Sequence, residues 1–175
     1  GTRAAAESAR LVLAQGNQHM PRTMGNSYLP VSRIDAFVVE DEELMQFVYP
    51  AGGQTASRIA QNAARLIDDG DCLHIGYGQI PYQVLRHLHG KRELGMHTEV
   101  VSDEVMHLVE AGVVTGRAKT HLPGRVVCSF CIGSREMYDH VDLNPSYLFL
   151  PSPQVYLPLE IAKDGRLVSV GSALE

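Results

Sequence analysis

The sequence predicts an α/β fold with a mostly parallel sheet flanked by helices. Across residues 55–175, apolar runs of strand length alternate with helix-like segments, which is typical of a parallel sheet with helices on both faces. One such run, Cys72–Ile75, is followed by a glycine-containing turn at residues 76–81 and then by a helix. The next apolar run, residues 96–101, carries a carboxylate at Glu99. This order of elements is expected to give two parallel strands joined by a crossover.

The two helices around the first of these strands are predicted from their apolar periodicity. Four residues before the strand share one face on a 3.6-residue period: Ile59, Ala63, Leu66 and Ile67. The turn-forming residues 68–71 are expected to end that helix. In the second helix, Pro81 suits the first turn because its φ is fixed and it has no N–H. This helix is expected to end at Gly90 and to bury Val84, Leu85 and Leu88.

Shorter elements complete the predicted alternation. Further helices are expected at residues 3–10, 102–112 and 133–138. Further strands are expected at residues 11–15, 34–39, 126–132, 147–150 and 167–170. The glycine- and proline-containing stretch at residues 49–54 predicts a boundary between two units of the chain.

The composition argues against several classes of protein. The formal net charge is −5 and no cluster of Lys and Arg occurs, which argues against nucleic acid as a partner. No apolar run approaches the roughly 18 residues of a membrane span, and the start Gly1-Thr2-Arg3 does not resemble a signal peptide. Three cysteines make no disulfide framework, which favours a reducing compartment. A cytoplasmic protein that does not enter a membrane is therefore expected.

Competing kinds of site are not supported by residue spacing. Cys128 and Cys131 have a C-x-x-C spacing, but they lie in an apolar run where residues three apart face opposite sides of a strand. We therefore predict that both are buried and unpaired. His87 and His89 are two apart on a helix and cannot face one ion, so no metal site is expected. The sequence lacks the serine-hydrolase G-x-S-x-G pattern, and the turn at residues 76–78 lacks the third glycine of a dinucleotide fingerprint.

The glycine turn and Glu99 form the candidate site. Ligands of open α/β sheets collect at the carboxyl ends of the strands, so neighbouring strands would bring residues 76–81 and Glu99 to one crevice. Glycines let a ligand approach the main chain and leave amide N–H groups free to face negative charge. A second interpretation is that Gly76 and Gly78 only form a tight turn and that Glu99 is a solvated carboxylate. The spacing alone does not separate the two interpretations.

Four stretches of sequence together point to a family. They read SARLVLAQGNQHMPRTMGNSY, LIDDGDCLHIGYGQIP, GMHTEVVSDEVMHLVEAGVVTG and PGRVVCSFCIGSREMYDHVDLNP. In this order they resemble the acetyl-CoA hydrolase/transferase family, which includes acetate, butyrate and 4-hydroxybutyrate CoA-transferases. The resemblance covers nearly the whole chain. It implies a CoA-transferase-like fold (NagB/RpiA/CoA-transferase-like), with two similar α/β domains and the active site between them.

The resemblance also divides the chain. Residues 1–49 would be the C-terminal part of a first α/β domain, residues 50–54 a linker, and residues 55–175 most of a second domain, truncated at its C-terminal end. Because family members are much longer, the resemblance implies a fragment, a split subunit or a partly traced protein. A homo-oligomer, or a partner chain that completes the active site, is expected.

Particular residues acquire roles from the resemblance. His97-Thr98-Glu99 matches the family's His-Ser/Thr-Glu motif, which implies that Glu99 is the catalytic residue. The family's Gly-Ile-Gly-Ala-Ile-Pro loop corresponds to residues 76–81, which implies that coenzyme A is bound by Gly76, Gly78, Gln79, Ile80 and Pro81. Coenzyme A would be a substrate, no cofactor would be permanently bound, and no metal would be needed.

The implied reaction is a ping-pong transfer of CoA between an acyl-CoA and a small carboxylic acid through a glutamyl-CoA thioester. An acyl-CoA hydrolase is an alternative at the same site, if water intercepts an intermediate. A third interpretation is a non-catalytic CoA-binding subunit that needs a partner chain.

Three segments depart from the family pattern. Ser102-Asp103 is followed by Glu104, where members usually have glycine. In the segment MPRTMGNS, Met24 and Asn26 replace an imidazole and a carboxylate. Tyr156-Leu157-Pro158 stands where many members have Asn-x-Pro, which predicts the loss of an amide that could donate a hydrogen bond to an oxyanion.

Overall fold

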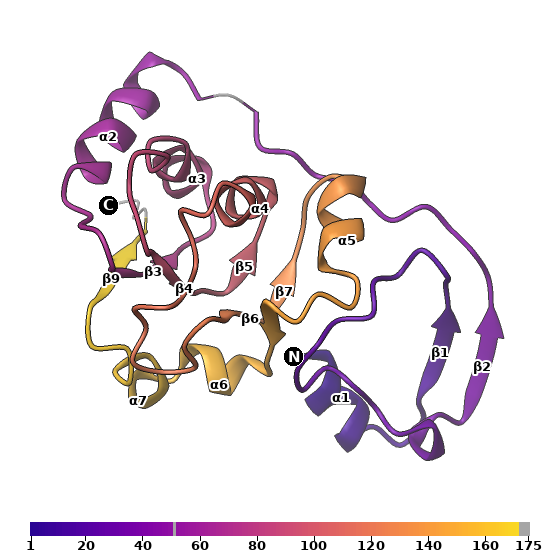
Figure 1. Cartoon of the computed structure of the whole chain (residues 1–175). Coiled ribbons are helices and arrows are strands. Elements are labelled where there is room, and N and C mark those ends of the chain that lie inside the picture. The colour runs from indigo at the N-terminus through magenta and orange to yellow at the C-terminus, as the bar shows by residue number, and fades with distance from the viewer. Residues whose placement is uncertain (51, 172–175) are drawn as a thin grey trace.

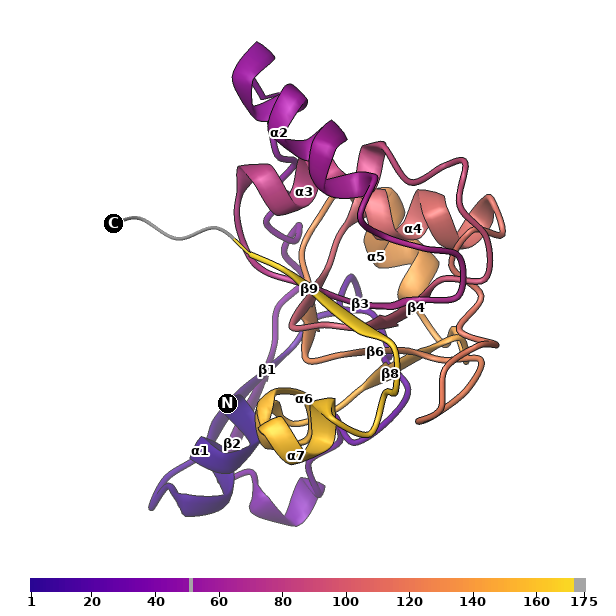
Figure 2. The same cartoon turned by 90° about the vertical axis from the view of Figure 1, so that its left-hand side faces the viewer.

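The structure, a computed structural model, describes residues 1–50 and 52–171. Its centre is a five-stranded parallel sheet in the order β8-β6-β4-β3-β9 (Figures 1 and 2). The strands are β3 (Cys72–Ile75), β4 (Gly95–His97), β6 (Val126–Cys128), β8 (Tyr147–Phe149) and β9 (Leu167–Val170). The predicted neighbours β3 and β4 pair directly. The predicted class, a mostly parallel sheet with flanking helices, is confirmed.

Helices cover both faces of this sheet, as Figure 2 shows. Four lie on one face: α2 (Gln54–Ala64), α3 (Gln79–Arg86), α4 (Asp103–Glu110) and α5 (Arg135–Val141). Two short helices lie on the other: α6 (Ser152–Tyr156) and α7 (Pro158–Ile161). The apolar core includes side chains that are at most 1% exposed, among them Leu73, Val84, Leu85, Met96 and Leu108. Because both faces are covered, the strands read as short apolar runs.

Two predicted strands, residues 96–101 and residues 126–132, are each divided in two. The pieces are β4 with β5 (Val100–Val101), and β6 with β7 (Phe130–Cys131). The prediction of two continuous strands is therefore wrong. The reason is local: the backbone N–H groups of Ser129 and Phe130 both donate to the carbonyl of Glu99, at 2.9 and 3.2 Å, which interrupts the regular ladder. β5 and β7 then pair with each other as a separate parallel sheet.

The helix before β3 ends earlier than predicted. α2 stops at Ala64, so Leu66 lies beyond it and is 80% exposed, while Ile59 on the helix is 45% exposed. The predicted apolar face is wrong for these two residues, because α2 turns its small residues Ala60 and Ala64 toward the core instead. It holds for two others that pack against the core, Ala63 and Ile67.

α3 differs from its prediction only at its ends. It begins at Gln79, two residues before Pro81, and it stops at Arg86 instead of Gly90. Beyond Arg86 the chain continues in tighter turns, in which the N–H of Leu88 bonds to the carbonyl of Leu85 at 3.1 Å. The three apolar residues predicted for its core side are all buried: Val84, Leu85 and Leu88.

Residues 1–50 carry a small sheet of their own. The elements are α1 (Thr2–Ser8), β1 (Leu13–Gly16), η1 (Val31–Arg33) and β2 (Ala36–Val39), and β1 pairs with β2 in parallel. Figure 1 shows these strands apart from the central sheet. The segment docks on β8, where Asn26 N–H donates to the carbonyl of Phe149 and Phe149 N–H donates to the carbonyl of Met24, both at 2.8 Å.

The division of the chain into residues 1–49, 50–54 and 55–175 stays a prediction. Ala51 in the predicted linker, and residues 172–175 at the end of the predicted second domain, lie outside the described residues. The separate β1–β2 sheet is compatible with that division, because a two-stranded parallel sheet is too small to form a core of its own.

Candidate active site

Glu99 lies in the bend between β4 and β5, at the carboxyl end of a central strand. Its carbonyl accepts the two N–H groups from the β6–β7 bend, and the residue is half-buried. Its carboxylate neighbours the hydroxyl of Tyr156, the last residue of α6. The side chain of Glu99 therefore faces the α6 side of the sheet.

Thr98 joins the glycine turn to the Glu99 bend. Its buried hydroxyl donates to the carbonyl of Ile75 at 2.8 Å and accepts the N–H of Ile75 at 3.1 Å. Ile75 ends β3, and the glycine turn begins at the next residue. One side chain thus holds the turn and the Glu99 bend together at the ends of two neighbouring strands.

Backbone geometry explains the glycines at positions 76 and 78 of the turn. Gly78 has φ +144° and ψ 167° at the N-cap of α3, a conformation that residues with a Cβ rarely adopt. At Gly76, a Cβ would lie 3.2 Å from the carbonyl oxygen of Val170. Among the other predicted contact residues, Gln79 is exposed, Ile80 is half-buried and Pro81 is buried. The backbone conformation and the close packing therefore account for both glycines without a ligand. Contact between the turn and a ligand stays a prediction.

A small pocket opens beside this turn. Its wall is made by the turn together with aromatic residues and the start of α4: Tyr49, Ile75, Gly76, Tyr77, Gly78, Tyr82, Leu85, Val100, Ser102 and Ile132. The rings of Tyr49 and Tyr82 are 4.3 Å apart at their centroids. In the part of the chain that the structure describes, Val100 lines the pocket and Glu99 does not. The turn and the Glu99 bend are neighbours, yet the carboxylate and the pocket lie on two sides of one strand end.

Gly78→Val is expected to reduce activity by more than its effect on folding explains. The positive φ costs a side-chain-bearing residue about 1–3 kcal/mol, and displacement of the turn by about 1 Å can cost about a hundredfold in rate. Turnover per folded molecule and the melting temperature of the complete protein measure the two effects. Gly90→Ala is the matched control, because a Cβ there meets nothing within 4 Å. Equal losses of activity and stability would show that Gly78 serves the turn alone.

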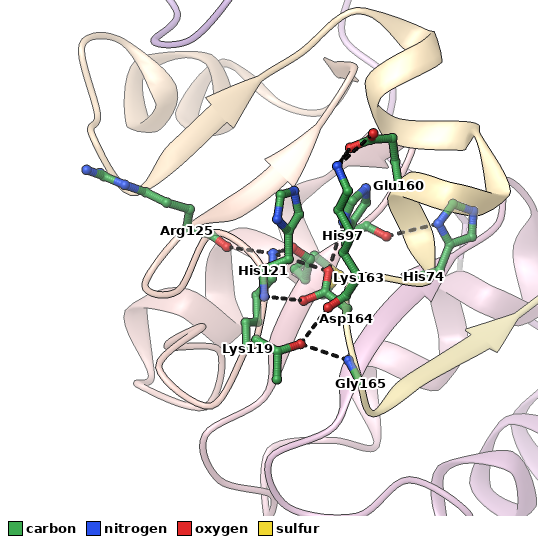
Figure 3. Close-up of polar contacts among 11 residues, drawn as sticks. His74, His97, Lys119, His121, Arg125, Glu160, Lys163, Asp164 and Gly165 are labelled. Carbon is green, nitrogen blue, oxygen red and sulfur yellow. Dashed lines mark hydrogen bonds and ion pairs between the residues drawn. The ribbon is translucent and has the colours of Figure 1, made fainter.

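Beside the Glu99 motif, a buried charged network supports β4 (Figure 3). His97 Nδ1 lies 2.9 Å from Asp164 Oδ2, and Lys119 Nζ lies 3.9 Å from the same oxygen. All three side chains are fully buried. Lys119 also donates to the carbonyls of Met96 and Arg125, at 3.1 and 3.3 Å. The network therefore ties β4 to the loops that precede β6 and β9.

Burial and pairing shift the protonation equilibria of this network. Burial lowers the pKa of Lys119, although the charge of nearby Asp164 opposes that change. At Asp164, burial acts to raise the pKa, but the hydrogen bond with His97 and the charge of Lys119 lower it, and the net shift is downward. Burial also raises the pKa of the neighbouring Cys72 thiol to about 12. The carboxylate of Asp164 is thus stabilised in its charged form, while the thiol is kept neutral.

The sequence predicts nothing about this network beyond His97, which belongs to the family motif. His97 and Asp164 are 67 positions apart, and no local pattern links them. Only the structure gives a reason for Gly95: a Cβ there would lie 2.5 Å from Lys119 Cγ, so the lysine side chain needs glycine at that position.

The two carboxylates that follow Glu99 in sequence take part in helix packing. Arg86 Nη2 lies 2.7 Å from Glu104 Oε1, which joins α3 to α4 and explains a carboxylate at position 104. Asp103 accepts the N–H of Ser134 at 3.2 Å, which joins α4 to α5. Neither side chain is therefore as available to a ligand as Glu99.

The cysteine prediction is confirmed in part. Cys128 and Cys131 are both free; Cys128 is fully buried, whereas Cys131 is half-buried. Within residues 1–50 and 52–171, no three His, Cys, Asp or Glu side chains are grouped so as to hold a metal ion. No helix in that part of the chain has both the length and the apolarity needed to cross a membrane.

Curated relatives match almost the whole chain. The 4-hydroxybutyrate coenzyme A transferase of Clostridium kluyveri is 42% identical over 174 residues, which are 99% of this chain and 41% of that protein. The succinyl-CoA:cyclohexane-1-carboxylate CoA transferase of Geobacter metallireducens is 33% identical over 174 residues, or 99% of this chain and 40% of that protein. The chain thus spans about two fifths of the length of the curated relatives it matches. No family model matches the sequence.

Solved structures show the same arrangement. The 4-hydroxybutyrate CoA-transferase of Porphyromonas gingivalis superposes with a TM-score of 0.90 at 40% identity, over 96% of this chain and 43% of that one. RipA from Yersinia pestis superposes with a TM-score of 0.89 at 32% identity, over 96% of this chain and 39% of that one.

Proposed function

We propose, because this chain belongs to the family of these CoA-transferases and forms part of such a domain, that the complete protein transfers CoA between an acyl-CoA and a small carboxylic acid. The observation that carries the proposal is the 42% identity, over 99% of this chain, with a protein named 4-hydroxybutyrate coenzyme A transferase. Glu99 follows the central strand β4 and is joined through Thr98 to the glycine turn.

Glu99 is the nucleophile in this proposal. It is half-buried, so it is reachable from outside, whereas Asp103 and Glu104 are committed to buried contacts. The glycine turn, with Gly76, Gly78, Gln79, Ile80 and Pro81, is proposed to lie along the thioester end of coenzyme A. Main-chain N–H groups of such a turn stabilise a developing oxyanion by about 3–4 kcal/mol per donor.

The proposed reaction passes through two covalent intermediates on Glu99. A carboxylate oxygen of Glu99 attacks the thioester carbonyl, the C–S bond breaks, and CoA leaves as the thiolate, which gives an acyl-glutamyl anhydride. The thiolate then attacks the glutamyl carbonyl and expels the first carboxylate, which leaves a glutamyl-CoA thioester. A second carboxylate reverses both steps and departs as its CoA thioester. No metal, redox partner or nucleotide hydrolysis is required.

The rest of the complete protein is proposed to contribute to the same site. The chain covers about two fifths of its relatives, so other segments, or a partner chain in a homo-oligomer, supply the remaining walls and the contacts with the remote parts of coenzyme A. Binding energy from those remote parts is what makes attack by a weak carboxylate nucleophile possible. A cytoplasmic location stays a prediction from composition.

The experiment uses the complete protein with acetyl-CoA, first alone and then with a second carboxylic acid. Acetyl-CoA alone is expected to build up a glutamyl-CoA thioester, which borohydride reduces to an alcohol that peptide mapping locates at Glu99. Addition of the second acid is expected to yield its CoA thioester. Free thiol without exchange would instead identify an acyl-CoA hydrolase. Binding of acetyl-CoA with neither product would identify a non-catalytic CoA-binding subunit.

A further inference from the structure

Tyr156 is the side chain that α6 presents to Glu99. It is the last residue of that helix, and its ring meets the ring of His74 edge to face, with centroids 6.3 Å apart and an interplanar angle of 72°. His74 is itself held by a hydrogen bond of 2.9 Å between its Nδ1 and the carbonyl of His97. The phenol ring is therefore positioned, through His74, against the end of β4, two residues before Glu99.

The hydroxyl of Tyr156 is buried and has no hydrogen-bond partner among the described residues. Leaving a buried hydroxyl without a partner costs about 1–3 kcal/mol. The Glu99 carboxylate lies close to this hydroxyl but not in hydrogen-bond geometry. Burial raises the pKa of Tyr156 most, and the Glu99 carboxylate raises it further. The phenol therefore stays protonated and is able to donate a hydrogen bond.

We propose that the Tyr156 hydroxyl is the hydrogen-bond donor to the glutamyl oxygen of Glu99 when that oxygen becomes negative. This inference rests on the proposed function. When CoA thiolate attacks the acylated Glu99, the S–C bond forms and the carbonyl electron pair moves onto the oxygen. The O–H of Tyr156 donates to that oxyanion without transferring its proton. Collapse restores the C=O bond and expels the carboxylate of the acid.

The sequence resemblance predicts that an amide donor is lost at position 156. A phenol hydroxyl now lies at that position, close to the reacting carboxylate. The phenol would therefore take the place of the amide donor that the resemblance implies. A role as base or nucleophile does not fit, because both would require a phenolate.

Tyr156→Phe in the complete protein keeps the ring and removes only the donor. Loss of one oxyanion donor lowers kcat by about a hundredfold to a thousandfold. We expect a loss of this size in the single-turnover rate of glutamyl-CoA formation, with KM and the melting temperature nearly unchanged. Tyr147→Phe is the matched control, because Tyr147 is also buried with an unpartnered hydroxyl, but it packs against His140, at a ring distance of 5.5 Å. The control is expected to keep the wild-type rate.

A fluorinated tyrosine at position 156 gives a second readout that packing alone does not change. Its more acidic phenol stops donating at lower pH, so the alkaline limb of the rate profile is expected to move to lower pH. Wild-type protein without a covalent adduct at Glu99 would overturn the proposed function itself. A wild-type adduct that Tyr156→Phe forms at an equal rate, or an alkaline limb that does not move, would overturn the role of Tyr156 alone.

Discussion

Replacing Glu99 with glutamine is expected to abolish CoA transfer by the complete protein. The amide has nearly the same shape, so the bend between β4 and β5 and its contacts with Ser129 and Phe130 are preserved. It lacks a nucleophilic carboxylate oxygen, so neither the anhydride nor the glutamyl-CoA thioester forms. Steady-state exchange and borohydride trapping measure the two losses independently.

Two further variants sharpen this prediction. Glu99→Asp is expected to retain about a hundredth of the activity or less, because a shorter side chain moves the carboxylate about 1 Å from its productive position. Glu136→Gln, which removes an exposed carboxylate from the first turn of α5, is the control and is expected to be fully active. An active Glu99→Gln protein, or reduction that maps to another residue, would end the assignment.

The largest expected effect on stability comes from the buried network beside the Glu99 motif. Asp164→Ala removes the carboxylate that faces both His97 and Lys119, and all three side chains are fully buried. Breaking a buried ion pair by removing one partner costs about 3–5 kcal/mol, because the remaining charge is left without compensation. A clear fall in the urea midpoint of the complete protein is therefore expected.

A double replacement tests the cause of that loss. Asp164→Leu combined with Lys119→Met removes both charges and refills most of the volume, so it is expected to recover much of the lost stability. Comparison with Asp164→Leu alone, which refills the volume but leaves Lys119 without its partner, separates the effect of the charge from the loss of volume. If the double variant unfolds as easily as Asp164→Leu alone, the uncompensated lysine is not the reason for the loss.

The sequence predicts the architecture well because it rests on local patterns. Apolar runs between turn residues indicate β3, β6, β8 and β9, and the periodicity of Val84, Leu85 and Leu88 indicates the buried side of α3. The breaks at Glu99 and Ser129 leave no such signal, because they arise when two N–H groups of one strand meet one carbonyl of its neighbour. The exposure of Ile59 and Leu66 also leaves no local signal, since it depends on which face α2 turns toward the core and on where the helix ends.

By itself, the sequence predicts the α/β class, the resemblance to CoA-transferases and the two parts of the candidate site, because each depends on residues that are close together along the chain. The glycine turn and the His97-Thr98-Glu99 motif are contiguous patterns of this kind. Tertiary structure alone decides which groups surround Glu99. Thr98 forms hydrogen bonds with Ile75, and Asp164 bonds to His97 across 67 positions of sequence. The hydroxyl of Tyr156, at the end of α6, lies close to the Glu99 carboxylate. Such contacts depend on how strands and helices stack, and no short stretch of sequence encodes that stacking.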